Sequence, residues 1–208
     1  GETADTLAAL RYCRARGMAS MAIVNVPESS IAREASALLP TRAGPEIGVA
    51  STKAFTAQLA VLALAAVSAG KARGRIDRAR EEEYVRELLS ASRLVAQTLK
   101  QADAIATAAH ALSQARDVLF LGRGPGQVLA LEGALKLKEI TYIHAEGYAA
   151  GELKHGPIAL IQEGVPVVVV APSDALFTKT LSNMEEVQAR GAKVILVSDA
   201  AGLEAAGA

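Results

Sequence analysis

Short apolar segments alternate with longer amphipathic segments along most of this chain. Apolar runs bounded by glycine, proline or polar residues predict β-strands at 21–26, 37–40, 117–121, 165–171 and 193–197. Apolar residues that recur every three or four positions predict helices at 4–16, 52–69, 77–100, 102–114 and 176–190, with one or two helical turns at 29–35. Strands that alternate with helices are typical of an α/β protein with a parallel sheet.

The stretch 130–157 carries an unusual concentration of ionisable side chains. Its first half predicts a helix with Leu131 and Leu135 on the apolar side. Glu132, Lys136 and Glu139 follow at i, i+4 and i+7, so their side chains project from one face. One interpretation is a solvated stripe of ion pairs that contributes a few tenths of a kcal/mol per pair. The other is a set of groups for acid–base chemistry.

A glycine-rich turn, Gly122-Arg123-Gly124-Pro125-Gly126, joins the strand at 117–121 to this helix. Backbone N–H groups at such a turn can bind an anion or sugar oxygens, or the glycines can simply allow a tight turn. The spacing differs from the dinucleotide pattern G-x-G-x-x-G, and no acidic residue ends a second strand about 20 residues later. We therefore expect no nicotinamide cofactor.

The second half of the stretch, GYAAGELKHGP, contains Gly147, Gly151, Gly156 and Pro157, which interrupt any long helix. This composition predicts a mobile or ligand-facing segment. His155 lies within it, next to Lys154. A lone histidine is more often a surface or core residue, but its closeness in sequence to a carboxylate-bearing helix favours proton transfer.

Composition narrows the class of protein. The chain has 208 residues, of which 51% are hydrophobic, and its 22 basic and 22 acidic residues give no net charge. We therefore expect globular domains with real cores and no nucleic-acid partner. The single cysteine, Cys13, excludes an internal disulfide and agrees with a cytoplasmic setting. The uncharged run 54–70 predicts a buried core helix rather than a membrane span.

Three separate motifs occur in the order found in one enzyme family. They are GETADT at the start, EIGVASTKAFTAQL at 46–59 and ALEGALKLKEITYIHAEGYAAGELKHGP at 130–157. Together they resemble the isomerase half of the glucosamine-6-phosphate synthase family, the isomerising glutamine–fructose-6-phosphate aminotransferases. The resemblance covers nearly the whole chain.

The resemblance implies an α/β fold of two sugar-isomerase-type three-layer α/β/α domains with parallel sheets, both truncated in this sequence. The first domain is expected at 1–76, connecting helices at 77–108 and the second domain at 109–208. An upstream strand with a serine-rich phosphate loop is expected to be missing, together with a last strand, a helix and a C-terminal tail.

The resemblance also assigns site residues. It implies catalytic roles for Lys136, Glu139 and His155, and substrate-binding roles for Thr3, Val49, Ala50, Ser51 and Glu132. Thr3 and Ser51 also read as ordinary helix N-caps on their own. No metal ligands are expected, because the three histidines lack a metal-binding spacing.

The implied reaction converts fructose 6-phosphate and glutamine-derived ammonia to glucosamine 6-phosphate. Isomerisation requires ring opening, a proton moved between C1 and C2, and a cation near the developing negative charge. His155, Glu139 and Lys136 respectively suit these roles, with Glu132 supporting Lys136. The family draws ammonia from a glutaminase domain and uses a tail lysine, and neither has a counterpart here. We therefore expect this piece alone to be inactive in the full reaction.

Two other functions stay open. One is a sugar-phosphate deglycase or phosphosugar isomerase, and the other is a noncatalytic sugar-phosphate sensor. The joint presence of Lys136, Glu139 and His155 favours an enzyme. The resemblance further implies a homodimer in which the segment that ends in His155 reaches the partner's site, with the glutaminase domain on the same full-length chain. No cofactor and no membrane partner are expected.

Overall fold

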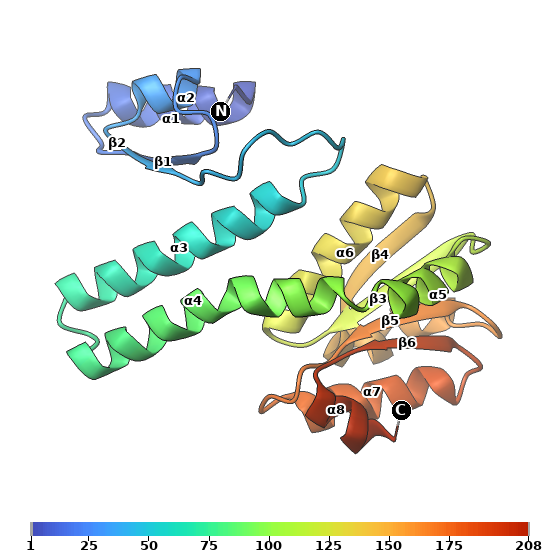
Figure 1. Ribbon diagram of the computed structural model, residues 1–208. Coiled ribbons are helices and arrows are strands. Elements are labelled where there is room, and N and C mark those ends of the chain that lie inside the picture. Colours follow the sequence, from blue (N-terminus) through green and yellow to red (C-terminus); the bar gives the residue numbers. More distant parts are fainter. Residues whose placement is uncertain (1, 208) are drawn as a thin grey trace. The chain divides into compact units, whose positions relative to one another are not determined.

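The computed structural model describes residues 2–207 and divides the chain into two compact units, Gly1–Lys100 and Gln101–Ala208 (Figure 1). This division is compatible with a two-domain interpretation. The more detailed prediction of two sugar-isomerase domains joined by connecting helices stays a prediction.

The first unit contains two parallel strands and four helices. In order they are α1 (Ala4–Ala15), β1 (Met21–Val24), α2 (Ser30–Glu34), β2 (Ala37–Pro40), α3 (Lys53–Ala72) and α4 (Arg78–Leu99). Met21 lies opposite Ala37 in the parallel ladder. α1 and α2 cover one face of the strands, where Ala22, Val24 and Ile31 form a small buried core. The predicted strands and helices of this half are therefore present.

The helix α3 differs from its prediction. A buried core helix was expected at 54–70, but no residue of α3 is buried. α3 packs against β1 and α4, and its leucines at 59, 62 and 64 are exposed. By length and composition alone α3 could cross a membrane, a test that core helices of globular proteins also pass. The apolar composition of α3 therefore does not mean that the helix is buried within this unit.

The second unit is a three-layer α/β/α structure around a four-stranded parallel sheet of order β4-β3-β5-β6. Its elements are α5 (Ala102–Leu112), β3 (Asp117–Gly122), α6 (Pro125–Thr141), β4 (His144–Ala149), the 3₁₀ helices η1 (Ala150–His155) and η2 (Pro157–Leu160), β5 (Pro166–Val170), α7 (Phe177–Gln188), β6 (Lys193–Val197) and α8 (Ala200–Ala206). The predicted α/β class with parallel sheets is confirmed.

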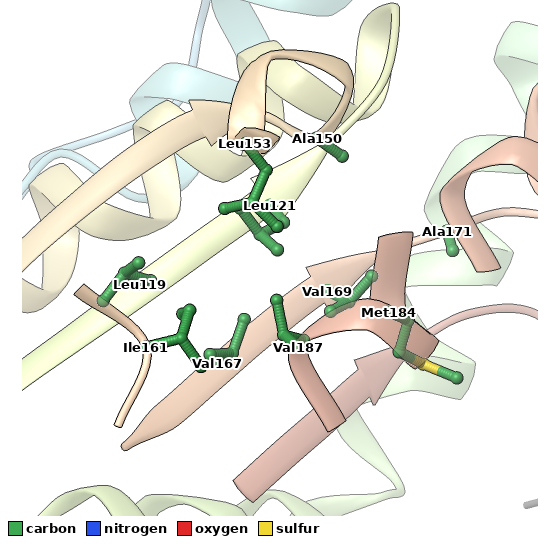
Figure 2. Packing of buried hydrophobic residues seen from close by; sticks show 10 residues of the cluster. All are labelled: Leu119, Leu121, Ala150, Leu153, Ile161, Val167, Val169, Ala171, Met184 and Val187. Atoms are coloured by element: carbon green, nitrogen blue, oxygen red, sulfur yellow. The ribbon is translucent and has the colours of Figure 1, made fainter. Parts of the chain in front are cut away.

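The two faces of this sheet are covered by different helices. On one face, Val118 and Phe120 of β3 pack against Ala130 and Ala134 of α6. On the other face, Leu119 and Leu121 of the same strand pack against residues of η1, α7 and β5 (Figure 2). Alternate residues of β3 thus face opposite layers, as the period of two along a strand requires. The sheet separates α6 from η1 and α7.

The buried side of α6 is made of small residues, namely Gly126, Ala130 and Ala134. The apolar side predicted from Leu131 and Leu135 is wrong, because both leucines are exposed. The cause is the close approach of the helix to β4. A Cβ atom at Gly147 would lie 2.8 Å from the Cα of Leu131, so only small side chains fit between helix and sheet.

The segment predicted to be mobile or ligand-facing packs partly into the core, while Glu152, Lys154 and His155 stay exposed. β4 pairs with β3 along its whole length, and Ala145, Ala150 and Leu153 are fully buried. The strand escaped prediction because its sequence, HAEGYA, has almost none of the β-branched residues that usually mark a strand. The short helix α8 was also not predicted.

Candidate functional site

The helix α6 presents one ammonium group between two carboxylates. Lys136 Nζ lies 2.5 Å from Glu139 Oε2 and 3.5 Å from Glu132 Oε1. This confirms that the three residues share one face of the helix. Their side chains are 22–37% exposed, so the groups are accessible to a ligand while their positions are restricted.

The electrostatics of this set favour a stable ammonium ion. The hydrogen bond to Glu139, followed by the charges of Glu139 and Glu132, raises the pKa of Lys136. Lys136 therefore stays a cation that can stabilise negative charge on a ligand, and Glu139 supplies a carboxylate that can accept a proton.

His155 does not join this set within its own unit. It is an exposed residue at the end of η1, and its neighbour Lys154 forms a 2.9 Å ion pair with Glu186 of α7. η1 and α7 lie on the sheet face opposite α6. Glu139 also lies 14 residues into α6, about 20 Å along the helix from the edge where β4 leads into η1. Two independent displacements therefore separate His155 from Glu139.

The glycine-rich turn at 122–126 is held by close contacts within the turn and by hydrogen bonds to α7. A Cβ atom at Gly122 would lie 2.2 Å from the carbonyl oxygen of Gly126, and Gly124 has a φ of +52°. Arg123 donates from Nε and Nη2 to the side-chain oxygen of buried Asn183, at 3.1 and 2.9 Å. The tight-turn interpretation thus accounts for these glycines.

Thr3 and Ser51 lie in the first unit, and neither caps a helix with its side chain. Thr3 occupies the N-cap position of α1, but its hydroxyl makes no capping hydrogen bond. Thr3 also lines a groove of about 550 Å³ between α1 and β1. Ser51 is exposed and precedes Thr52, the N-cap residue of α3. The N-cap interpretation is therefore wrong for the Thr3 and Ser51 hydroxyls, which leaves both available to a ligand.

Val49 and Ala50 precede Ser51 in the same loop. Val49 is 97% exposed, whereas Ala50 is 5% exposed. No cluster of side chains able to hold a metal ion occurs within residues 2–207.

The model of the SIS domain family matches residues 1–68 and 111–207. The chain belongs to the SIS domain family. Among its relatives, the glutamine–fructose-6-phosphate aminotransferase (isomerizing) of Brucella abortus biovar 1 is 62% identical over 206 residues. That alignment covers 99% of this chain and 34% of the relative. The protein of the same name from Zymomonas mobilis is 61% identical over 207 residues, again with 34% of the relative covered.

Solved structures of related proteins also resemble this SIS chain. The C-terminal domain of glucosamine-fructose-6-phosphate aminotransferase from Francisella tularensis matches with a TM-score of 0.95 and 47% identity. The match covers 98% of this chain and 58% of that one. Glucosamine-6-phosphate deaminase from Thermotoga maritima matches at 25% identity and a TM-score of 0.74, over 95% of this chain and 57% of that one. The chain spans about a third of the length of the curated relatives it matches.

One polar residue of the SIS chain was missed by sequence reasoning. The carboxylate of Glu46 accepts hydrogen bonds from Ala54 N at 2.9 Å, Thr52 Oγ1 at 3.1 Å and Thr52 N at 3.4 Å. These bonds, chiefly the one from Ala54, lower the pKa of Glu46. The missed signal was an acidic residue a few positions before a helix whose first turn carries no acid of its own.

Proposed function

We propose that the chain is the sugar-isomerising part of an enzyme that converts fructose 6-phosphate and glutamine-derived ammonia to glucosamine 6-phosphate. The observation that carries the proposal is the Glu132–Lys136–Glu139 set on α6, in a chain 62% identical to an isomerising aminotransferase. An ammonium ion beside a carboxylate supplies the cation and the base that ketose–aldose isomerisation requires.

In this proposal Glu139 moves the proton between C1 and C2 of the open-chain sugar. Lys136 stabilises the negative charge that develops on oxygen, and Glu132 helps to hold Lys136. Thr3, Ser51 and the loop residues Val49 and Ala50 bind the sugar phosphate. His155 donates a proton during ring opening.

The position of His155 supports a proposal about the assembly. Because the sheet lies between η1 and α6, His155 of one subunit cannot serve Glu139 of the same second unit without a large rearrangement. We therefore propose a homodimer of two-domain subunits in which His155 completes the partner's site. In this proposal the glutaminase domain on the same full-length chain supplies ammonia. The single cysteine of the chain supports a cytoplasmic setting.

A second candidate function comes from the Thermotoga maritima match, whose name is glucosamine-6-phosphate deaminase. A deaminase or deglycase would use the same carboxylate and ammonium ion in the reverse direction, with water as the second substrate. A phosphosugar isomerase would neither consume nor release ammonia. A noncatalytic sensor would bind the sugar phosphate and leave it unchanged.

The deciding experiment uses the full-length protein with fructose 6-phosphate and glutamine, and measures glucosamine 6-phosphate together with glutamate. Stoichiometric formation of both products is expected. Ammonia release from glucosamine 6-phosphate without glutamine-dependent synthesis would select the deaminase instead, and binding without turnover would select the sensor. The chain 1–208 alone is expected to form no glucosamine 6-phosphate from glutamine.

A further inference from the structure

We propose that Glu46 is a positioning residue that holds the substrate loop, Ile47–Ser51, by binding the N-terminus of α3. The inference rests on the proposed function, because it takes Ile47–Ser51 to be a sugar-phosphate-binding loop. It adds a residue to that site which does not itself touch the substrate.

The contacts of Glu46 span the loop. Its two carboxylate oxygens bind groups of Thr52 and Ala54, six and eight residues further along the chain. The backbone between Glu46 and Thr52 must therefore form a closed arch over the start of the helix. Ile47–Ser51 themselves form no hydrogen bond within the described part of the chain, so the carboxylate of Glu46 and the burial of Ala50 restrain this arch.

A second clamp holds the preceding part of the loop. Asn25, which follows β1, accepts hydrogen bonds from Ala43 N at 2.8 Å and Thr41 Oγ1 at 3.0 Å. Its amide nitrogen donates to the carbonyl oxygen of Gly44 at 2.6 Å. The chain is thus fixed up to Gly44 by Asn25, and from Glu46 onward by the carboxylate. Only the clamp formed by Glu46 acts on the arch itself.

The same contacts occupy part of one possible phosphate-binding surface, the N-terminus of α3. A helix N-terminus attracts anions through its free backbone N–H groups. At α3 the N–H groups of Thr52 and Ala54 already bind Glu46, which leaves fewer N–H groups there for a substrate phosphate. The loop instead offers its own N–H groups and the exposed hydroxyl of Ser51. Val49, which is 97% exposed, adds no side-chain packing that would fix the loop without Glu46.

A merely structural role for Glu46 would be that of a helix cap. Asp77 provides the matched control, because its carboxylate caps α4 in the same unit through Arg80 N at 2.8 Å. Removal of either cap is expected to lower the melting temperature. Only removal of Glu46 is expected to change how the protein binds sugar phosphate.

The test compares Glu46→Ala, Glu46→Gln and Asp77→Asn in the full-length protein. Glu46→Ala is expected to raise KM for fructose 6-phosphate at least about tenfold while kcat stays within about threefold, because binding geometry is lost and the acid–base groups are kept. Glu46→Gln, which keeps one acceptor oxygen, is expected to give a smaller rise in KM. Asp77→Asn is expected to leave both constants unchanged.

Amide hydrogen exchange supplies a readout that does not depend on activity. Faster exchange at 47–54 in Glu46→Ala, with no change there in Asp77→Asn, is the expected result. Unchanged exchange at 47–54, or a KM equal to that of Asp77→Asn, would overturn the proposal. Glu46→Gln decides by the same two criteria if Glu46→Ala does not fold. If the wild type binds no sugar phosphate, the proposed function fails, while the exchange data still decide whether Glu46 holds the loop.

Discussion

Lys136 illustrates how helical spacing alone can build a polar site. Positions i, i+4 and i+7 place Glu132, Lys136 and Glu139 side by side, and this much followed from the sequence. The position of these three residues relative to His155 could not be predicted from the sequence, because it depends on which face of α6 is buried. That choice is made by Ala130 and Ala134, not by the larger leucines.

The first prediction at this scale concerns Glu139. In the full-length protein, Glu139→Gln is expected to leave sugar-phosphate binding near normal and to lower isomerisation by at least about a hundredfold. The amide keeps the size of the side chain but cannot accept the proton. Turnover and the dissociation constant of the sugar phosphate are measured in parallel. Near-wild-type turnover would remove Glu139 from the mechanism.

The second prediction concerns Asp199, which joins two loops beside α8. Its carboxylate accepts hydrogen bonds from Ser173 N at 2.7 Å, Ser173 Oγ at 2.9 Å and Gly202 N at 3.0 Å. These bonds, led by the one from Ser173 N, lower the pKa of Asp199 from 3.8 to about 2. A depressed pKa means that the stabilisation is present above pH about 4 and is lost as the pH falls toward about 2.

Asp199→Asn is therefore expected to lower the melting temperature at neutral pH, with a difference from wild type that shrinks near pH 2. Thermal unfolding followed by circular dichroism at both pH values gives the measurement. Asp174→Asn is the control, since its carboxylate accepts a single N–H, from Leu176, and the expected difference is smaller. If the melting temperatures of wild type and Asp199→Asn differ by the same amount at both pH values, the ionisation of Asp199 does not contribute to stability as proposed.

At the scale of elements, β4 and η1 show where sequence reasoning was misled. Glycines in GYAAGELKHGP suggested mobility, but Gly147 is required by the contact with α6. Leu153 points into the core beside Leu121 (Figure 2). Glycine at a close backbone approach and glycine in a flexible loop look alike in a sequence, and only the packing partner separates them.

The packing of η1 leads to a prediction about Leu153, which is fully buried. Leu153→Ala is expected to lower the free energy of unfolding by about 2–5 kcal/mol, because it removes buried methyl groups and leaves a cavity. Leu160→Ala, in η2, is the control: this side chain is 51% exposed, so the expected loss is below about 1 kcal/mol. Urea unfolding measures both values. Equal losses would mean that the segment is not packed as described.

At the scale of the whole molecule, the alternation of strands and helices was sufficient to predict an α/β protein with parallel sheets. Strand periodicity and helix periodicity are local, so they can be read without knowledge of the partners. The separation of His155 from Glu139 could not be predicted in this way. It depends on the assignment of η1 and α6 to opposite faces of one sheet, which is a property of the complete second unit.

That separation leads to the last prediction, which concerns the proposed homodimer. Full-length subunits that carry His155→Ala are mixed with subunits that carry Glu139→Gln, each inactive alone. If His155 acts in the partner's site, a mixed dimer has one site with both residues intact and one site with neither. Random exchange makes half of the dimers mixed, so about a quarter of wild-type activity is expected to return.

The control for this experiment is a mixture of Lys136→Ala and Glu139→Gln subunits. Lys136 and Glu139 lie on the same helix, with Nζ and Oε2 2.5 Å apart, so both must come from one subunit. A mixed dimer of these variants has no intact site, and activity is expected to stay at background. If the His155→Ala mixture also stays at background after mass spectrometry has confirmed subunit exchange, His155 acts within its own subunit and the shared site is wrong. Recovery in the first mixture alone would require the crossover, because no other arrangement restores His155 and Glu139 to one site.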